Sequence, residues 1–270
     1  MVDRRAMSVA WKLERNGLKT VCVPESVENE VATTAYSFGF NSALSFSIEL
    51  LDRIRAGARA RHKIAVVEVL GEHTGWLALQ AGIAALADAI LIPEMPYNLD
   101  KVAERLVLNQ RDNRRPALVV VAEEARPACD GGDSSSRGAG TIENIRRALS
   151  PGSSAEGTSN GRRVIRRSGA ASEAVAPELQ RRTNIESFSF VLDQVLRGGP
   201  ITSVDRQIGL AYGAAAVRGL TDGPTGEMVA FQPTHIAFVP LAQAVNKVRT
   251  VPPASEFVLA ARALGISLGD

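Results

Sequence analysis

The feature that most constrains the fold is a strand–loop–helix–strand pattern over residues 67–94. An apolar run over 64–70 stops at Gly71, a short polar loop follows, and a helix is expected to begin near Gly75. A second apolar run covers 89–93 and ends in an acidic residue. Runs that are apolar throughout, rather than alternating, are typical of parallel strands buried on both faces. The pattern therefore predicts one βαβ unit and an α/β fold.

The same unit predicts where a ligand would bind. Gly71, Glu72 and His73 directly follow the first of the two strands. Open α/β sheets bind ligands in the crevice beyond the carboxyl ends of their strands. These residues are therefore candidates for a functional site.

The remaining apolar patterns and breakers predict further helices and strands along the chain. Gly17, Pro24 and the pair Gly223-Pro224 mark element ends. Helices are expected over 4–15, 43–60, 99–110, 173–182, 204–220, 241–248 and 255–264, strands over 19–23, 117–121 and 188–192, a tight turn over 197–200, and a hairpin from 228–231 and 235–239.

Composition narrows the class of protein. The 31 basic and 29 acidic residues nearly balance, which argues against nucleic acid or a membrane surface as the partner. Apolar runs stay shorter than the ~18 residues of a membrane span. Cys22 lies in an apolar strand and Cys129 in a polar loop, so a reducing compartment without a structural disulfide is expected. With no signal-peptide pattern at the N-terminus, we expect a cytoplasmic protein.

A segment rich in glycine and serine interrupts the pattern. Residues 130–161 are too polar to offset the entropy of ordering, so a flexible surface insertion is expected near 130–170. A short helix is expected within it over 142–149. The basic patch Arg162, Arg163, Arg166 and Arg167 is interpreted as a solvated loop, with phosphate binding as the alternative.

Several ordered motifs together resemble one family. They are GLKTVCVPESVENE, YSFGFNSAL, VEVLGEHTGW, VVVAEEA, RGGP followed by Asp205-Arg206, and the ending RALGISLGD. In this order they resemble the phosphofructokinase family, and the ending is similar to its pyrophosphate-dependent and mixed-substrate branch. The resemblance implies a two-lobed α/β/α fold with the active site between the lobes.

The resemblance also implies how the lobes divide the chain. Residues 1–39 and 197–250 would form the donor-side lobe, and residues 40–196 and 251–270 the sugar-phosphate-side lobe. Family members begin this first lobe well before the position of Met1, with glycine-rich loops for the donor and an aspartate that positions Mg2+. That aspartate falls at Arg4, or at Asp3 with a shift of one. We therefore expect a truncated N-terminal lobe and a doubtful Mg2+ site.

The family's catalytic base corresponds to Glu28. Ser26 and Glu30 occupy neighbouring motif positions, but glutamate is one methylene longer than the family's aspartate, and reacting geometry tolerates displacements of about 1 Å poorly. Glu25 stands where pyrophosphate-using members have lysine. Glu72 stands where the family has an arginine that assists the transferred group. These are two charge reversals.

The residues that would hold the sugar phosphate are also changed. Two family arginines from the neighbouring subunit correspond to Lys63 and Phe188, and the family histidine corresponds to Gln194. Arg197 is retained. Lysine keeps the charge but loses the bidentate fork of arginine, so binding of the sugar phosphate is expected to be weak or lost.

Two further positions match residues that meet the sugar itself. Glu123 corresponds to the glutamate that accepts sugar hydroxyls, and Gly71 to a close approach of the backbone. His62, His73 and His235 have no partner at metal-ligand spacing and are interpreted as surface or turn residues.

These observations leave three hypotheses open. In the first, the chain is a catalytically impaired phosphofructokinase homologue that acts as a binding or regulatory subunit of an intact paralogue. In the second, it is an enzyme whose N-terminal part lies upstream or on another chain. In the third, it is a decayed fragment. Because the family builds its sugar site across a subunit boundary, the surface around Lys63 and Phe188 is an expected interface. We therefore expect a homo-oligomer, or a hetero-oligomer with a paralogue.

Overall fold

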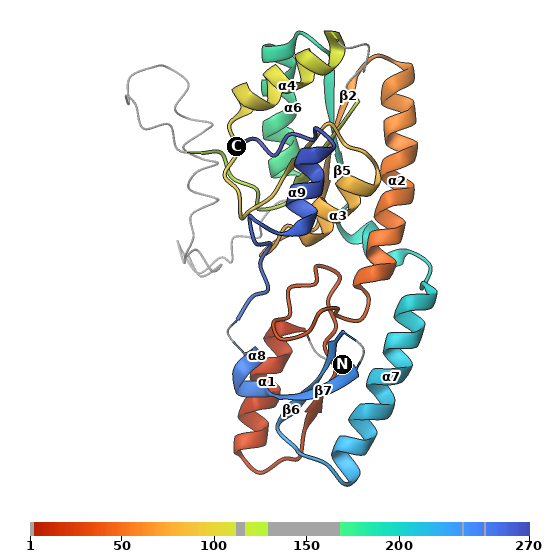
Figure 1. Cartoon of the computed structure of the whole chain (residues 1–270), viewed down its shortest axis with the longest axis vertical. Helices are drawn as coiled ribbons and strands as arrows, with labels where there is room; N and C mark the ends of the chain where they lie inside the picture. Colours follow the sequence, from red (N-terminus) through yellow and green to blue (C-terminus); the bar gives the residue numbers. More distant parts are fainter. Residues whose placement is uncertain (1–2, 112–116, 129–167, 234, 246) are drawn as a thin grey trace, which may run out of the picture.

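The protein folds into two lobes that are stacked along its long axis (Figure 1). The computed structural model describes residues 3–111, 117–128, 168–233, 235–245 and 247–270. Each lobe has its own sheet, and helix α2 (Phe40–Ala60) rises from the junction along one side of the upper lobe. The predicted α/β fold is confirmed.

The lower lobe is built on a three-stranded sheet in the order β1-β6-β7. Strands β1 and β6 are parallel, and β6 and β7 form the predicted antiparallel hairpin. Met7 of α1 and Leu241 of α8 are buried against one part of this sheet, while Tyr212 of α7 is buried in a second cluster. The elements are α1 (Arg4–Arg15), β1 (Val21–Cys22), α7 (Ser203–Thr221), β6 (Glu227–Gln232), β7 (His235–Pro240) and α8 (Leu241–Ala244).

The upper lobe is built on a four-stranded parallel sheet in the order β3-β4-β2-β5. One face packs against α2, α3 and α9, and the other against α4 and α6. Both faces are therefore covered, which explains the continuous apolar runs. The elements are β2 (Ile64–Val69), α3 (Trp76–Ala84), β3 (Ala89–Leu91), α4 (Leu99–Arg111), β4 (Leu118–Ala122), α6 (Ala170–Thr183), β5 (Ser187–Val191), the 3-10 helix η1 (Asp193–Gly198) and α9 (Glu256–Ala263).

The structure refines the predicted βαβ unit. Strands β2 and β3 are parallel and buried, as predicted, but they are not neighbours, because β4 lies between them. A strand that arrives later in the chain fills this gap. Hydrophobic periodicity describes one segment at a time, so it could not give this order.

Three predicted helix ends are wrong, and one of them is the start of the helix expected from residue 173, which begins at Ala170. The helix expected over 241–248 ends at Ala244, because Val245 already has extended backbone (ψ 136°). The helix expected from residue 43 begins at Phe40, after Gly39 with a φ of 96°. In place of the tight turn expected over 197–200, a 3-10 helix runs to Gly198.

A distant carboxylate explains the early start of α2. Asp205, fully buried on α7, accepts hydrogen bonds from the Gly39 amide (3.1 Å), the Ser42 amide (2.7 Å) and the Ser42 hydroxyl (2.5 Å). It thereby satisfies amide groups of the first turn that have no partner within the helix. These three hydrogen bonds tie the beginning of α7 in the lower lobe to the beginning of α2.

A second buried carboxylate positions α6 against the upper sheet. Glu68 on β2 is 2% exposed and accepts hydrogen bonds from the amides of Gly169 (2.7 Å) and Ser172 (2.8 Å) at the start of α6. Negative charge is favourable at a helix N-terminus. Glu68 thus replaces an apolar core contact with a specific polar one.

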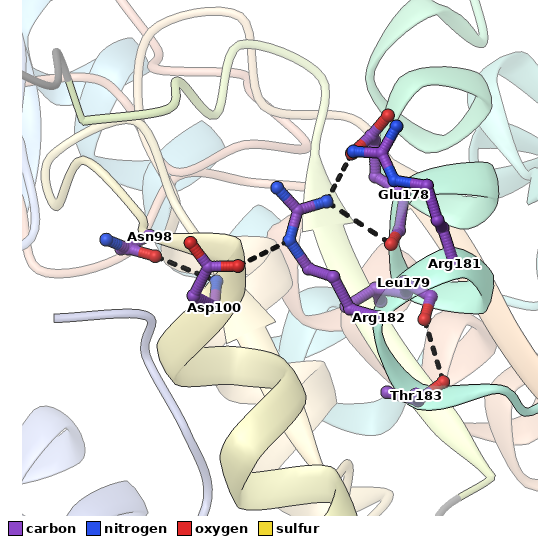
Figure 2. Close-up of polar contacts among 7 residues, drawn as sticks. All are labelled: Asn98, Asp100, Glu178, Leu179, Arg181, Arg182 and Thr183. Carbon is purple, nitrogen blue, oxygen red and sulfur yellow. Dashed lines mark hydrogen bonds and ion pairs between the residues drawn. The ribbon is translucent and has the colours of Figure 1, made fainter.

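Surface ion pairs connect α6 to α4 at the top of the upper lobe (Figure 2). Arg182 donates from Nε to Asp100 (2.6 Å) and pairs with Glu178 on its own helix. The Asn98 side chain accepts from the Asp100 amide (2.8 Å) and begins α4. Because these groups are largely exposed, they orient the helix ends more than they stabilise the fold.

Some sequence predictions fall outside the described residues. These are nearly all of the flexible insertion expected near 130–170, the short helix over 142–149, the basic patch from Arg162 to Arg167, and Cys129. Cys22 is a free, buried thiol, and burial raises its pKa. In the parts of the chain that the structure describes, none of the helices is both long enough and apolar enough to cross a membrane.

We predict that Asp205→Ala lowers the free energy of unfolding by about 1–3 kcal/mol, because it leaves buried amides at the start of α2 without an acceptor. Urea unfolding followed by circular dichroism measures the change. Asp222→Ala, at the exposed C-terminal end of the same helix, is the matched control and should cost less than about 0.5 kcal/mol. Equal losses in the two variants would contradict the capping role of Asp205.

Candidate functional site

The candidate site lies where the loop after β1 meets the loop after β2. Its first contact is a hydrogen bond from the Glu72 amide to Glu28 Oε2, at 2.9 Å. On the lower-lobe side, the Ser26 hydroxyl accepts from the Glu28 amide (3.1 Å) and shapes the turn that presents Glu28. A carboxylate of one lobe thus contacts the backbone of the other.

A second carboxylate lies beside the first. Glu30 is paired with Arg4 at the start of α1, with 3.7 Å between Arg4 Nε and Glu30 Oε2. Burial raises the pKa of Glu30, His73 and Arg4 lower it, and the charges of Glu72 and Asp3 raise it further. Asp3 itself accepts from the Ala6 amide (2.7 Å) as the N-cap of α1.

Glu72 is the third acidic member and has two basic neighbours. Arg5 Nη2 lies 3.4 Å from Glu72 Oε1, and His73 Nε2 lies 3.9 Å from the same oxygen. Helix α1 therefore directs Arg4 and Arg5 toward two different glutamates. The carboxylate of Glu72 therefore has two basic groups of the same chain beside it.

The most perturbed group of the site is Glu28. Burial is the main cause that raises its pKa to about 7, and the charges of Glu30, Glu123 and Glu72 add to it, while the Glu72 amide acts in the opposite direction. Near neutral pH this carboxyl therefore exchanges a proton readily. Perturbed carboxyls of this kind are the groups from which enzymes make general acids and bases. We call Glu28, Glu30, Glu72 and Glu123 the carboxylate cluster.

The C-terminal segment holds the cluster in place. The Arg249 amide donates to the Glu30 carbonyl (2.8 Å), and Trp76 Nε1 donates to the Arg249 carbonyl (3.0 Å). The Arg249 guanidinium stacks over the Trp76 ring at 4.3 Å, and burial lowers its pKa. Glu94 adds a further tie, because its carboxylate accepts from the amides of Gly75 (3.0 Å) and Val251 (2.8 Å).

Packing alone requires a glycine at position 71. A β-carbon on Gly71 would lie 2.9 Å from Ala122 Cβ and 3.1 Å from the Thr74 carbonyl oxygen. The Gly71 carbonyl also accepts from the Glu124 amide (3.3 Å), which ties the loop after β2 to the turn after β4 that carries Glu123. This glycine therefore sets the position of both loops.

The other predicted site residues lie elsewhere. Lys63 precedes β2, at the opposite end of the strand from Glu72, and pairs with Glu186. Phe188 lies on the edge strand β5, where its ring meets that of Phe190 edge-on at 5.3 Å. Gln194 and Arg197 are exposed on η1.

His73 was predicted to lie at the carboxyl end of a strand and was interpreted as a surface or turn residue, and Arg5 and Arg249 were given no role. His73 contacts the carboxylate cluster, and its place directly after Glu72 was the available signal. Arg5 and Arg249 lie far from Glu72 and Trp76 in sequence, so no local pattern links them. Only the folded chain brings these cations to the lobe junction.

Mg2+, which the family resemblance implies, does not fit the cluster. Glu28 accepts from an amide, Glu30 is paired with Arg4, and Glu72 is paired with Arg5. Among the described residues, no three His, Cys, Asp or Glu side chains converge as metal ligands. No step is therefore assigned to a metal here.

Known proteins resemble the chain over nearly its whole length. A family model described as Phosphofructokinase matches residues 4–220. The chain is 36% identical over 262 residues to the ATP-dependent 6-phosphofructokinase of Chloroflexus aurantiacus, covering 97% of this chain and 66% of that protein. It is also 36% identical over 247 residues to the pyrophosphate–fructose 6-phosphate 1-phosphotransferase of Amycolatopsis methanolica, covering 92% and 66%. The chain thus spans about two thirds of the length of these relatives.

Solved structures agree on the fold. The chain is similar to a pyrophosphate-dependent phosphofructokinase from Nitrosospira multiformis, with a TM-score of 0.70 and 19% identity over 99% of this chain and 66% of that one. It is also similar to the Pichia pastoris phosphofructokinase in the T-state, with a TM-score of 0.62 and 25% identity over 92% of this chain and 22% of that one.

We predict that Glu28→Gln stabilises the protein above pH 7 and leaves it nearly unchanged at pH 4. The folded-state pKa of Glu28 lies above the ordinary glutamate value of 4.5, so the folded state binds more protons between pH 4.5 and 7, and stability falls as the pH rises through this window. The glutamine side chain in Glu28→Gln stays uncharged at all pH values and removes that loss of stability. The free energy of unfolding should therefore rise by about 2–3 kcal/mol at pH 8.

The measurement is urea unfolding at several pH values between 4 and 8. Glu25→Gln, on the same loop but exposed, is the matched control for the loss of one carboxylate. A stability difference between Glu28→Gln and the wild type that does not vary with pH would contradict the assignment.

Proposed function

The chain belongs to the phosphofructokinase family, and from this premise we propose that it is a homologue with impaired phosphoryl transfer to fructose 6-phosphate. The observation that carries the proposal is the carboxylate cluster at the junction of the two lobes. Phosphoryl transfer requires cationic groups around the moving phosphoryl group. Here the two arginines nearest the cluster, Arg4 and Arg5, lie beside two of its own carboxylates, Glu30 and Glu72.

The arrangement of charge supports this reading. Glu72 contributes a negative charge beside Glu28, and the partner of that charge is Arg5 of the same chain. A phosphate entering the cluster would meet like charge, and the nearest arginines, Arg4 and Arg5, already lie 3.7 Å from Glu30 and 3.4 Å from Glu72. Glu28 keeps the proton-exchange property of a base. The proposal therefore places the defect in phosphate binding rather than in proton transfer.

A second candidate function is that of a non-catalytic subunit that binds a phosphofructokinase paralogue. A specific feature favours it: the edge strand β5 exposes apolar side chains. Phe190 is 42% exposed on the face of β5 that it shares with Phe188, and Val191, 38% exposed, lies on the opposite face. Phe188 replaces a family arginine on the same strand. Apolar edges of this kind are suited to burial against another protein.

We predict that the purified chain does not convert fructose 6-phosphate to fructose 1,6-bisphosphate, with either ATP or pyrophosphate as the donor. The reason is the reversed charge at Glu25 and Glu72. A coupled enzymatic assay measures turnover, and a rate above about 1 s⁻¹, the low end for kinases, would refute the proposal.

The same assay separates the two candidate functions. If the chain is a regulatory subunit, adding it to an active phosphofructokinase relative changes the rate of that relative. Phe190→Asp should then abolish the effect, because it places a charge on the exposed apolar face that Phe190 shares with Phe188. A homologue that is merely impaired leaves the relative's rate unchanged.

We predict that the chain binds fructose 6-phosphate weakly and that two substitutions strengthen this binding. Charge-assisted hydrogen bonds contribute about 1.5–3 kcal/mol each. The two groups that Phe188 and Gln194 would replace should therefore weaken binding by roughly two to four decades in the dissociation constant. Phe188→Arg combined with Gln194→His should recover at least one decade, by calorimetry on the assembled protein. Ser189→Arg, which adds the same charge on the opposite face of β5, is the control. Tight binding by the wild type, or equal recovery in the control, would contradict the account.

A further inference from the structure

Glu94, which follows the end of β3, joins two segments that are far apart in the chain. Its Oε1 accepts hydrogen bonds from the Thr74 hydroxyl (2.9 Å), the Gly75 amide (3.1 Å) and the Val251 amide (2.8 Å). Its Oε2 lies 3.0 Å from the same Gly75 amide. All of these partners are donors, so position 94 requires a side chain that only accepts hydrogen bonds. An ionised carboxylate meets this requirement.

The first segment that Glu94 holds is the loop after β2, which carries Glu72. Thr74 of this loop is fully buried, and Gly75 is the N-cap of α3. Negative charge is favourable at this end of a helix. A β-carbon on Gly75 would lie 2.4 Å from Ile92 Cβ and 2.9 Å from Glu94 Oε2. The loop therefore lies tightly against the end of β3, and the Glu94 carboxylate holds it there.

The second segment that Glu94 holds returns from the lower lobe to α9. We call its residues 248–251 the strap. The Arg249 amide of the strap donates to the Glu30 carbonyl (2.8 Å). Two residues later, the Val251 amide donates to Glu94, and Val251 itself is 1% exposed. The strap therefore connects a residue of the carboxylate cluster in the lower lobe to Glu94 in the upper lobe.

We propose that Glu94 is a positioning residue of the carboxylate cluster, which sets Glu72 through the loop after β2 and Glu30 through the strap. Glu72 lies two residues before Thr74, and Glu30 accepts from the strap two residues before Val251. Glu94 therefore acts on the two carboxylates through the backbone of these segments. A single side chain of the upper lobe thereby fixes cluster members from both lobes relative to each other.

Glu28 is the group whose titration reports this positioning. Its carboxylate accepts from the Glu72 amide (2.9 Å), and it lies two residues before Glu30 in the chain. Burial is the main cause that raises its pKa to about 7, and the charges of Glu30, Glu123 and Glu72 add to it. A loop and a strap released from Glu94 would let water reach Glu28 and let the like charges move apart. Both causes would then weaken, and the pKa of Glu28 would fall.

The test is the carbon-13 NMR titration of Glu28 in the full-length chain, with Glu94 replaced in two ways. Glu94→Ala removes every acceptor at this position and should lower the midpoint by about one pH unit or more. Glu94→Gln removes the same charge but keeps an oxygen at the Oε1 position, which makes three of the four contacts. Its midpoint should stay within about 0.3 of a pH unit of the wild type. The two variants separate the loss of position from the loss of charge.

Asp88→Ala is the matched control for a loss of stability alone. Asp88 directly precedes β3, at the opposite end of that strand from Glu94, and its carboxylate accepts from the amides of Ala117 (2.8 Å) and Leu118 (3.1 Å). Its removal should lower the free energy of unfolding about as much as Glu94→Ala does, measured by urea unfolding, and leave the Glu28 midpoint unchanged. A folded-state pKa does not depend on global stability, so a merely structural role of Glu94 would not move it.

If Glu94→Ala does not fold, Thr74→Val replaces it, because this variant removes one buried donor to Glu94 with little change of shape. It should lower the Glu28 midpoint, and Thr74→Ser, which keeps the hydroxyl, should not.

Four results would overturn the proposal. They are an unchanged midpoint in Glu94→Ala, or in Thr74→Val where that variant stands in for it, an equal fall in Glu94→Gln, an equal fall in Asp88→Ala, and a wild-type midpoint already near 4.5. None of these readouts uses turnover, so this proposal and that of impaired phosphoryl transfer can fail separately.

Discussion

The hydrogen bond from the Glu72 amide to the Glu28 carboxylate is the contact on which the site depends. It joins a loop of the lower lobe to the loop after β2 of the upper lobe, at 2.9 Å. Burial first, and then the like charges around it, raise the pKa of the Glu28 carboxyl, so it gains a proton far more easily than an exposed glutamate does. The chain therefore keeps its lobes together around a group that changes charge near neutral pH.

This arrangement explains how the chain tolerates an acidic site. Arg4 and Arg5 follow one another at the start of α1 and pair with Glu30 and Glu72. The cations that a phosphate would need are supplied, but they are bound to the chain's own carboxylates. A fold that is shared with phosphofructokinases thus holds, at its lobe junction, four carboxylates, of which Glu30 and Glu72 have an arginine of α1 within 4 Å. Fold and site chemistry are separate properties of a sequence.

Sequence patterns predicted the elements far better than their connections. Helix α1 and strand β2 follow from local periodicity and from the breakers Gly17 and Gly71, so their predicted positions are confirmed. The start of α2 was missed, because its cap, Asp205, lies 163 residues from Ser42. The family resemblance identified Glu28 and Glu72 as candidates, and the structure brings them together. The pairing of Arg5 with Glu72 depends on tertiary structure, which no local pattern encodes.

The most direct measurement of the central claim is the titration of the Glu28 side chain itself. Carbon-13 NMR of the glutamate carboxyls, with Glu28→Gln used to assign the signal, follows its charge as the pH is changed. The account predicts a midpoint near pH 7, with Glu72→Gln lowering it because one neighbouring negative charge is removed. A midpoint near 4.5 in the folded protein would contradict the account, since the cluster would then neither bury nor crowd this carboxyl.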